Sequence, residues 1–210
     1  MFNQLYDDFF YRRHNDFWKQ QALRKLPDLL SSTGMLACGE DLGMIPACVA
    51  SVMDSQRILS LEIQRMPKDP AVEFGDPMRY PQLCVCTTST HDMSPVRAWW
   101  EEEDRALIQR FYNNMLGRQG AAPANATADI CEQIIRQHLA SPAMLTILPL
   151  QDWLAMDAGL RYEHADQERI NIPANPRHYW RYRMHRTLED LLSQHAFNGK
   201  LREMVKYYSR

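Results

Sequence analysis

The stretch Leu83-Cys-Val-Cys-Thr-Thr-Ser89 is an apolar run of strand length, and it leads directly into the polar tripeptide Thr90-His91-Asp92. Three other short apolar runs have the same design, at residues 35–38, 58–63 and 144–148. Runs of this length are too short for a typical helix, so we expect four strands. Each strand opens into a polar loop.

Helix-like segments alternate with these strands. Pro46 is well placed as the first residue of a helix that reaches about Gln56, Pro95 opens a second helix, and apolar residues recur at helical spacing over 130–139. Parallel strands need a crossover connection, so the alternation predicts parallel βα units. It fits both a closed barrel and an open sheet.

Both ends of the chain are expected to be helical. Apolar and aromatic residues recur at helical spacing from Phe9 to Leu26, and Pro27 is expected to end that helix. Leucines and other apolar residues mark C-terminal helices after Leu188, beyond an irregular stretch over 159–177.

The composition is that of a globular protein without a strong charge bias. The 210 residues are 45% hydrophobic, and 24 Lys and Arg stand against 26 Asp and Glu. We therefore expect no nucleic-acid partner and no anionic membrane surface as a partner. An uncharged polysaccharide fits better, because proteins stack sugar faces on aromatic rings and 10% of the residues are aromatic.

Five cysteines, without the even count or spacing of a disulfide framework, indicate reduced thiols. Cys84 and Cys86 would share one face of a strand, but no Cys/His set follows at zinc-site spacing, so we expect no metal and no other cofactor. The first residues form neither a signal peptide nor an apolar span, which favours a cytoplasmic protein.

Acidic residues follow two of the expected strands. Glu40 closes the first and Asp92 the third, with Gln64 and Arg65 at the end of the second. Barrels of βα units place their chemistry in such loops. Cleaving a glycosidic bond needs a proton donor at the leaving oxygen and negative charge beside the oxocarbenium-like centre, so two acidic tips at one mouth favour a glycosidase-type site. Without further context, a Glu-Asp pair in this position is usually a helix cap or solvated.

Four motifs together make the pattern specific. They are Gly-Glu40-Asp41-Leu-Gly-Met-Ile-Pro, Thr-His91-Asp92, Leu-Pro-Leu-Gln151-Asp152-Trp-Leu and Arg169-Ile-Asn171-Ile-Pro173. In this order and spacing the chain resembles the 4-α-glucanotransferase (amylomaltase, disproportionating enzyme) family over nearly its whole length. It is most similar to the plant cytosolic form and its bacterial relatives. Met93 departs from the family, since many bacterial amylomaltases have Asn there.

The resemblance implies roles for individual residues. Glu40 would be the general acid/base, Asp92 the transition-state stabiliser, and His91 a ligand of the same sugar, while Asp41 is expected to support its loop. The remaining candidates for substrate contact are Gln64, Arg65, Gln151, Asp152 and Asn171.

The resemblance also implies a fold and an activity. The chain would be an α/β, helix-rich C-terminal half of a (β/α)8 TIM barrel, with about four parallel strands and residues 1–210 as one part of the catalytic domain. The family's nucleophile is an Asp on the preceding strand in an Arg-x-Asp-His-type motif, and nothing before Glu40 matches that motif. The expected function is transfer of α-1,4-glucan segments between maltodextrins by retaining double displacement, with this chain inactive alone.

Two other readings stay open. The chain could be a non-catalytic α-glucan-binding fragment, or a half-barrel interaction module that self-associates or pairs with the missing N-terminal half, because an open half-barrel leaves strand edges unpaired.

Two aromatic clusters are expected to be structural. Adjacent helical residues point about 100° apart, so Trp99 and Trp100 cannot both face a ligand and are predicted to pack in the core. The segment Tyr179–Arg183 interleaves aromatic and basic residues, and we expect it to be a buried anchor for the C-terminal helices.

Overall fold

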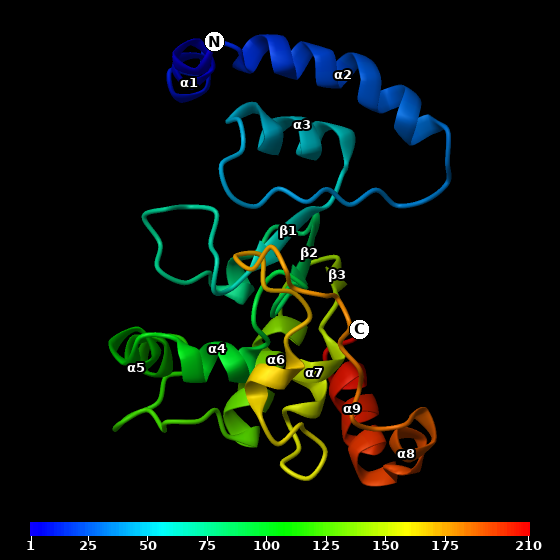
Figure 1. Cartoon of the computed structure of the whole chain (residues 1–210). Helices are drawn as coiled ribbons and strands as arrows, with labels where there is room; N and C mark the ends of the chain where they lie inside the picture. Colours follow the sequence, from blue (N-terminus) through cyan, green and yellow to red (C-terminus); the bar gives the residue numbers. More distant parts are fainter.

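A computed structural model describes residues 1–210 and contains a three-stranded parallel sheet in the order β1-β2-β3 (Figure 1). The strands are β1 (Ser60–Ile63), β2 (Cys84–Thr87) and β3 (Leu145–Thr146). Ser60 lies opposite Cys84, and Val85 opposite Leu145. The four β2 residues are buried, as expected for a strand between two neighbours.

The expectation of four strands is wrong by one. The run at 35–38 does not form a strand and makes only an isolated parallel bridge between Cys38 and Leu59. Met35 and Leu36 are 77% and 53% exposed, so no apolar layer supports a longer pairing. Cys38 nevertheless pairs with Leu59, the residue just before β1. Because this pairing is parallel, the chain leaves Cys38 toward the same edge as the ends of the other strands.

Nine α-helices and two 3-10 turns account for most of the remaining regular structure. The helices predicted to start at Pro46 and Pro95 begin at Cys48 and Val96, within two residues of the prediction. The predicted helix over 130–139 also forms. The helices are α1 (Phe2–Phe10), α2 (Asn15–Ser31), α3 (Cys48–Gln56), α4 (Val96–Glu102), α5 (Arg105–Asn114), α6 (Ala128–Leu139), α7 (Leu150–Leu154), α8 (Leu188–Ser193) and α9 (His195–Tyr207), and the turns are η1 (Pro77–Arg79) and η2 (Ala165–Glu168).

The predicted helix end at Pro27 is wrong, since α2 continues through it to Ser31. Proline removes one hydrogen-bond donor from the helix and leaves the Leu23 carbonyl without its partner. No residue of α2 is buried, so water can satisfy that carbonyl. Helix α2 therefore tolerates a proline that a buried helix would not.

The main core lies below the sheet, among α4, α5 and α6. Thirteen buried residues form it, with Trp100 and Phe111 fully enclosed and Trp99 packed edge-to-face on Phe111 at a centroid distance of 5.1 Å. The prediction that both tryptophans pack in the core is confirmed. A second cluster of seven buried residues joins α6 and α7 to α9.

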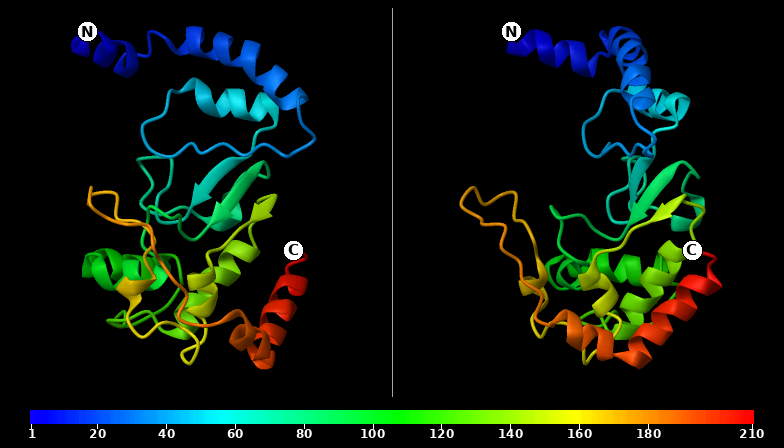
Figure 2. Two further views of the ribbon diagram at one scale, coloured as in Figure 1. Left: turned by 45° about the vertical axis from the view of Figure 1, so that its right-hand side comes forward. Right: turned by 90° about the vertical axis from the view of Figure 1, so that its right-hand side faces the viewer.

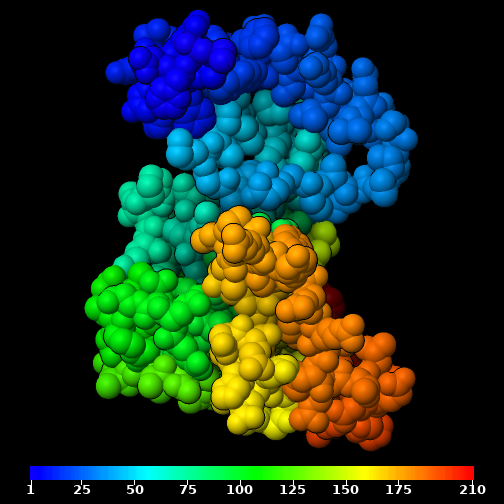
Figure 3. Space-filling model, in the orientation of Figure 1, coloured from blue at the N-terminus to red at the C-terminus, as the bar shows by residue number.

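The sheet separates two unlike ends of the molecule. Helices α1–α3 lie on one side of it, and α4–α9 form a denser body on the other (Figures 1 and 3). The segment near residues 170–180 leaves that body as a long loop (Figure 2). No helix has the length and apolar character needed to cross a bilayer.

Candidate active site

The polar candidates gather at the carboxyl-terminal edge of the sheet, because parallel strands end on one side. Arg65 follows β1, His91 and Asp92 follow β2, and the Gln151-Asp152 pair follows β3. Glu40 follows the Cys38 bridge that flanks β1. The order along this edge is therefore Glu40, Arg65, the His91-Asp92 loop and the Gln151-Asp152 pair.

Three side chains form an exposed polar cluster beyond β2. The Asp92 carboxylate accepts a hydrogen bond from Asn171 Nδ2 at 2.5 Å and lies 3.2 Å from His91 Nε2. The backbone N–H of Asn171 also donates to the backbone carbonyl of His91 at 3.1 Å. The His91 and Asp92 side chains are 55% and 51% exposed, so this His91–Asp92–Asn171 cluster can meet a ligand from solvent.

An aromatic ring adjoins this cluster. Trp180 lies with its ring centroid 5.0 Å from that of His91, and it is 60% exposed. The prediction that Tyr179–Arg183 is a buried anchor is wrong, because Tyr179 is 75% exposed as well. The segment arches away from the C-terminal helices, and an exposed indole beside polar groups is a surface on which sugar rings stack.

Asp152 lies beneath the His91-Asp92 loop. Its carboxylate accepts from the Thr88 hydroxyl at 2.5 Å, the Ser89 hydroxyl at 3.0 Å and the Val96 amide at 2.8 Å. The residue is 1% exposed. Because its carboxylate accepts all three hydrogen bonds from protein groups, Asp152 caps α4 and holds the loop. Neither of its oxygens is exposed to a substrate.

Arg65 holds the same loop from the other side. Its guanidinium donates to the carbonyls of Thr88 (2.8 Å) and Ser94 (2.9 Å), and it lies 4.9 Å from the Trp99 ring centroid. Burial lowers the pKa of Arg65 to about 10, with Asp152 acting in the opposite direction. The group therefore stays protonated at neutral pH, and its donors are used within the protein.

The two glutamine candidates are also buried. Gln64 is 1% exposed and donates to Gln137 Oε1 at 3.1 Å, and Gln151 is 5% exposed and donates to the Glu168 carbonyl at 3.2 Å. Neither of these glutamine side chains reaches the surface where the His91–Asp92–Asn171 cluster lies. Sequence position at a strand end thus identified the edge correctly, but not which side chains are exposed there.

Glu40 and Asp41 are neighbours in the sequence, but one side chain faces solvent and the other is buried. Glu40 is exposed, and its carboxylate accepts from the Leu42 amide at 2.9 Å. Asp41 is 2% exposed, accepts from the Leu61 amide at 2.9 Å and pairs with Lys68 at 2.7 Å. The prediction that Asp41 supports the loop is confirmed, and the Glu40 side chain lies at the surface.

The surroundings of two residues escape sequence reasoning. Basic and aromatic residues interleave around Trp180 as in a nucleic-acid patch, and the net charge of −2 favours the predicted buried anchor instead, while Glu168 carries no motif at all. Glu168 is buried near Arg97, whose guanidinium lies 3.4 Å away, and burial raises the pKa of Glu168 to about 7. The only available signal for Trp180 is its nearness to Asn171 along the chain.

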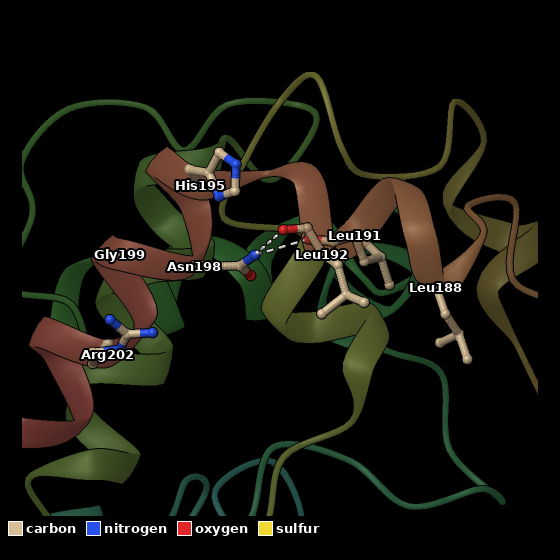
Figure 4. A pocket seen from close by; sticks show the side chains of 7 residues that line it. All are labelled: Leu188, Leu191, Leu192, His195, Asn198, Gly199 and Arg202. Atoms are coloured by element: carbon tan, nitrogen blue, oxygen red, sulfur yellow. Dashed lines mark hydrogen bonds between the residues drawn. The ribbon is translucent and has the colours of Figure 1, made fainter.

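A hollow lies away from the sheet edge, between α8 and α9 (Figure 4). It measures about 710 Å³ and is lined by three leucines together with His195, Asn198, Gly199 and Arg202. Asn198 turns inward and donates to the Leu191 carbonyl at 2.9 Å. No carboxylate lines this hollow, whereas Glu40 and Asp92 lie at the sheet edge.

Comparison with known proteins points to one family. The family model described as 4-alpha-glucanotransferase (Glyco_hydro_77) matches residues 1–189. The 4-alpha-glucanotransferase DPE2 of Oryza sativa subsp. japonica is 45% identical over 202 residues, which is 96% of this chain and 21% of that protein. The 4-alpha-glucanotransferase of Chlamydia trachomatis serovar D is 29% identical over 181 residues, which is 84% of this chain and 33% of that protein.

A solved structure shares the fold. The amylomaltase from Streptococcus agalactiae in complex with acarbose superposes with a TM-score of 0.61 at 22% identity, covering 82% of this chain and 32% of that one. This chain thus spans 21% to 33% of the length of these three relatives.

Proposed function

This chain belongs to the 4-alpha-glucanotransferase family, and we propose that the protein containing it transfers α-1,4-glucan segments from one maltodextrin to another. The observation that carries the proposal is the exposed His91–Asp92–Asn171 cluster, with Trp180 beside it, at the same sheet edge as Glu40. An exposed carboxylate, polar donors and an indole ring together suit a neutral sugar.

Glu40 serves as the general acid and base in this proposal. Its carboxyl proton moves to the glycosidic oxygen as the bond breaks, and the carboxylate later takes a proton from the acceptor's 4-hydroxyl. Its exposure supports this role, because both sugars must reach the same oxygen atoms. Asp41 supports it from below through Leu61 and Lys68, which keep the loop in place.

Asp92 serves as the stabiliser of the oxocarbenium-like sugar. The carboxylate is oriented by Asn171 and His91, and each of these keeps a polar group near the surface for the sugar's hydroxyls. Asp152 and Arg65 act on substrate indirectly, by holding the backbone on both sides of the loop. Gln64 and Gln151 belong to the same supporting layer.

A retaining mechanism needs a third carboxylate, as nucleophile. Asp41 and Asp152 are buried and bonded to protein groups, which leaves neither free to attack a sugar carbon. We propose that the nucleophile comes from outside these 210 residues and that the three parallel strands are part of a (β/α)8 barrel that includes it.

The test of the acid/base role is Glu40→Gln in the full-length protein, with maltotriose as substrate. The variant keeps the shape of the side chain and loses the proton, so transfer should fall by roughly 10² to 10⁴ while maltodextrin binding is retained. The matched control is Glu163→Gln, an exposed glutamate that is not among the edge residues, which should leave turnover unchanged. If Glu40→Gln kept more than about a tenth of the turnover, the assignment would be wrong.

The chain alone provides a second test. Incubated with maltotriose, it should produce neither glucose nor longer maltodextrins, because no glycosyl-enzyme intermediate can form without the nucleophile. Activity from the 210 residues alone would show that one of their own carboxylates is the nucleophile. Activity that appears only when an N-terminal part is added would support the proposal.

A further inference from the structure

A second hollow is lined by eleven residues between Tyr162 and Arg183, and none of the eleven is assigned to sugar transfer. It measures about 740 Å³, which is within the range of small-ligand sites. Four of its eleven lining residues are arginines, and none is an aspartate or glutamate. The arginines are Arg169, Arg177, Arg181 and Arg183.

Most of this positive charge is not neutralised within the protein. Only Arg169 has a carboxylate nearby, with Glu102 at 3.5 Å, and it also donates to the Asn171 carbonyl. Arg181 lies 6.0 Å from the Tyr179 ring centroid and forms no ion pair. The side chains of Arg177 and Arg183 have neither a hydrogen bond nor an ion pair.

Like charges collected around one hollow repel each other, so an anion that enters gains from several guanidinium groups at once. Guanidinium groups bind phosphate oxygens through paired N–H donors, and this bidentate geometry makes arginine a preferred phosphate ligand. A phosphate dianion carries more negative charge than a carboxylate and offers three acceptor oxygens in place of two, so it suits a site with several arginines better.

The rest of the lining suits a sugar. Tyr162, Tyr179 and Tyr182 contribute aromatic rings to the same hollow, and rings of this kind stack on sugar faces. Arg169 connects the hollow to the catalytic side through its bond to Asn171, the residue that orients Asp92. The hollow therefore adjoins the proposed glucan site without sharing its carboxylates.

We propose that the hollow lined by these four arginines binds a phosphoryl group, carried by a phosphorylated sugar. The phosphoryl assignment stands on the arginines alone, whereas the sugar assignment rests on the proposed function. Free inorganic phosphate shares the same chemistry, and the experiment distinguishes the two sources.

The test is calorimetric titration of the chain with inorganic phosphate, glucose 6-phosphate and glucose at low ionic strength. Both phosphates should bind saturably, and glucose should not. Tighter binding of glucose 6-phosphate identifies a phosphorylated sugar as the ligand, and equal binding identifies phosphate itself. Raising the salt concentration should weaken both, since the attraction is between charges.

The variants are Arg181→Gln and Arg183→Gln, each of which should weaken phosphate binding by about tenfold or more, as expected for the loss of a charge-assisted contact. Arg202→Gln on α9 is the matched control and should bind like the wild type. Thermal unfolding identifies any variant that fails to fold, and Arg177→Gln, also exposed, then replaces it. Absence of saturable binding by either phosphate, or binding that all of these variants leave unchanged, would overturn the proposal. The titration needs no turnover, so it can fail while the transferase proposal stands.

Discussion

The two loops that present Glu40 and Asp92 are held in different ways. The loop around Glu40 is held mainly by one buried neighbour, Asp41, through Leu61 and Lys68. The loop that bears Asp92, by contrast, is bonded by side chains from three separate segments of the chain. These are Arg65, Asp152 and Asn171.

The surroundings of the loops differ in the same direction. On the Glu40 side, α1 and α2 have no buried residue and α3 has two of nine, whereas the Asp92 loop leads into α4, where five of seven residues are buried. The Asp92 loop is therefore set by the core of this chain. The position of Glu40 depends on a local contact and a thin layer, so we expect it to be the more adjustable half of the site.

The largest effect in this comparison is expected for Asp92→Asn. The variant keeps the Asn171 contact but loses the charge that faces the distorted sugar, so kcat of the full-length protein should fall by roughly 10³, with a smaller change in KM. Steady-state kinetics on maltotriose measure this, with Asp28→Asn on exposed α2 as control. A raised KM with unchanged kcat would reduce Asp92 to an ordinary binding residue.

Asp152→Ala tests whether the Asp92 loop is held by the core. The change leaves the Thr88 and Ser89 hydroxyls and the Val96 amide without their acceptor, which should cost about 3 kcal/mol of unfolding free energy. Urea denaturation followed by fluorescence measures the loss. Stability within about 0.5 kcal/mol of the wild type, the range of neutral surface changes, would contradict the supporting role.

Glu168→Gln tests whether the buried Glu168 carboxyl group makes stability depend on pH. Burial raises the pKa of Glu168 to about 7, so the folded state binds the proton more tightly than the unfolded state. The unfolding free energy should therefore fall by roughly 1 kcal/mol per pH unit as the pH rises from about 5 to 6, and this fall should be absent in the variant.

His138 changes the unfolding free energy with pH in the opposite direction to Glu168. Because His138 is present in both the wild type and Glu168→Gln, its contribution cancels in the comparison of the two. Burial lowers the pKa of His138 to about 4, which makes the unfolding free energy rise with pH up to the ordinary histidine range. Parallel stability curves for the wild type and Glu168→Gln would show that Glu168 does not titrate in this range.

The smallest effect is expected for Asp41→Asn, on the Glu40 side. The amide oxygen still accepts from Leu61, and Lys68 keeps its pairing with Glu62 at 2.9 Å, so one contact is lost and the cost should be about 1 kcal/mol, below that of Asp152→Ala. The same denaturation experiment measures it. A loss as large as that of Asp152→Ala would show that the two loops are held equally firmly.

Much of the fold could be predicted from local sequence. The buried strand at 84–87 and the helix at 128–139 have the apolar patterns that their environments require, and the prolines before α3 and α4 mark the chain's turn into a helix. The run at 35–38 has a similar pattern but no apolar layer to pack on, and pattern alone cannot reveal that difference.

The candidate site could be predicted by position, but not by role. Asn171 reaches Asp92 across 79 residues and Asp152 reaches Thr88 across 64, so only the folded chain brings these groups together. Exposure is likewise a property of the fold. It separates Asp92 from Asp152, and Trp180 from Trp100, although each pair is alike in the sequence.

The most direct test of the central claim, that Glu40 is the acid/base of a retaining transferase, is azide rescue of Glu40→Ala in the full-length protein. With α-maltosyl fluoride, whose leaving group needs no proton, the variant should still form the glycosyl-enzyme intermediate. Azide needs no general base and enters on the face vacated by the Glu40 carboxylate, so it should raise the turnover and yield an α-glycosyl azide, with two inversions giving net retention. A turnover that azide does not change, or a product of β configuration, would contradict the account.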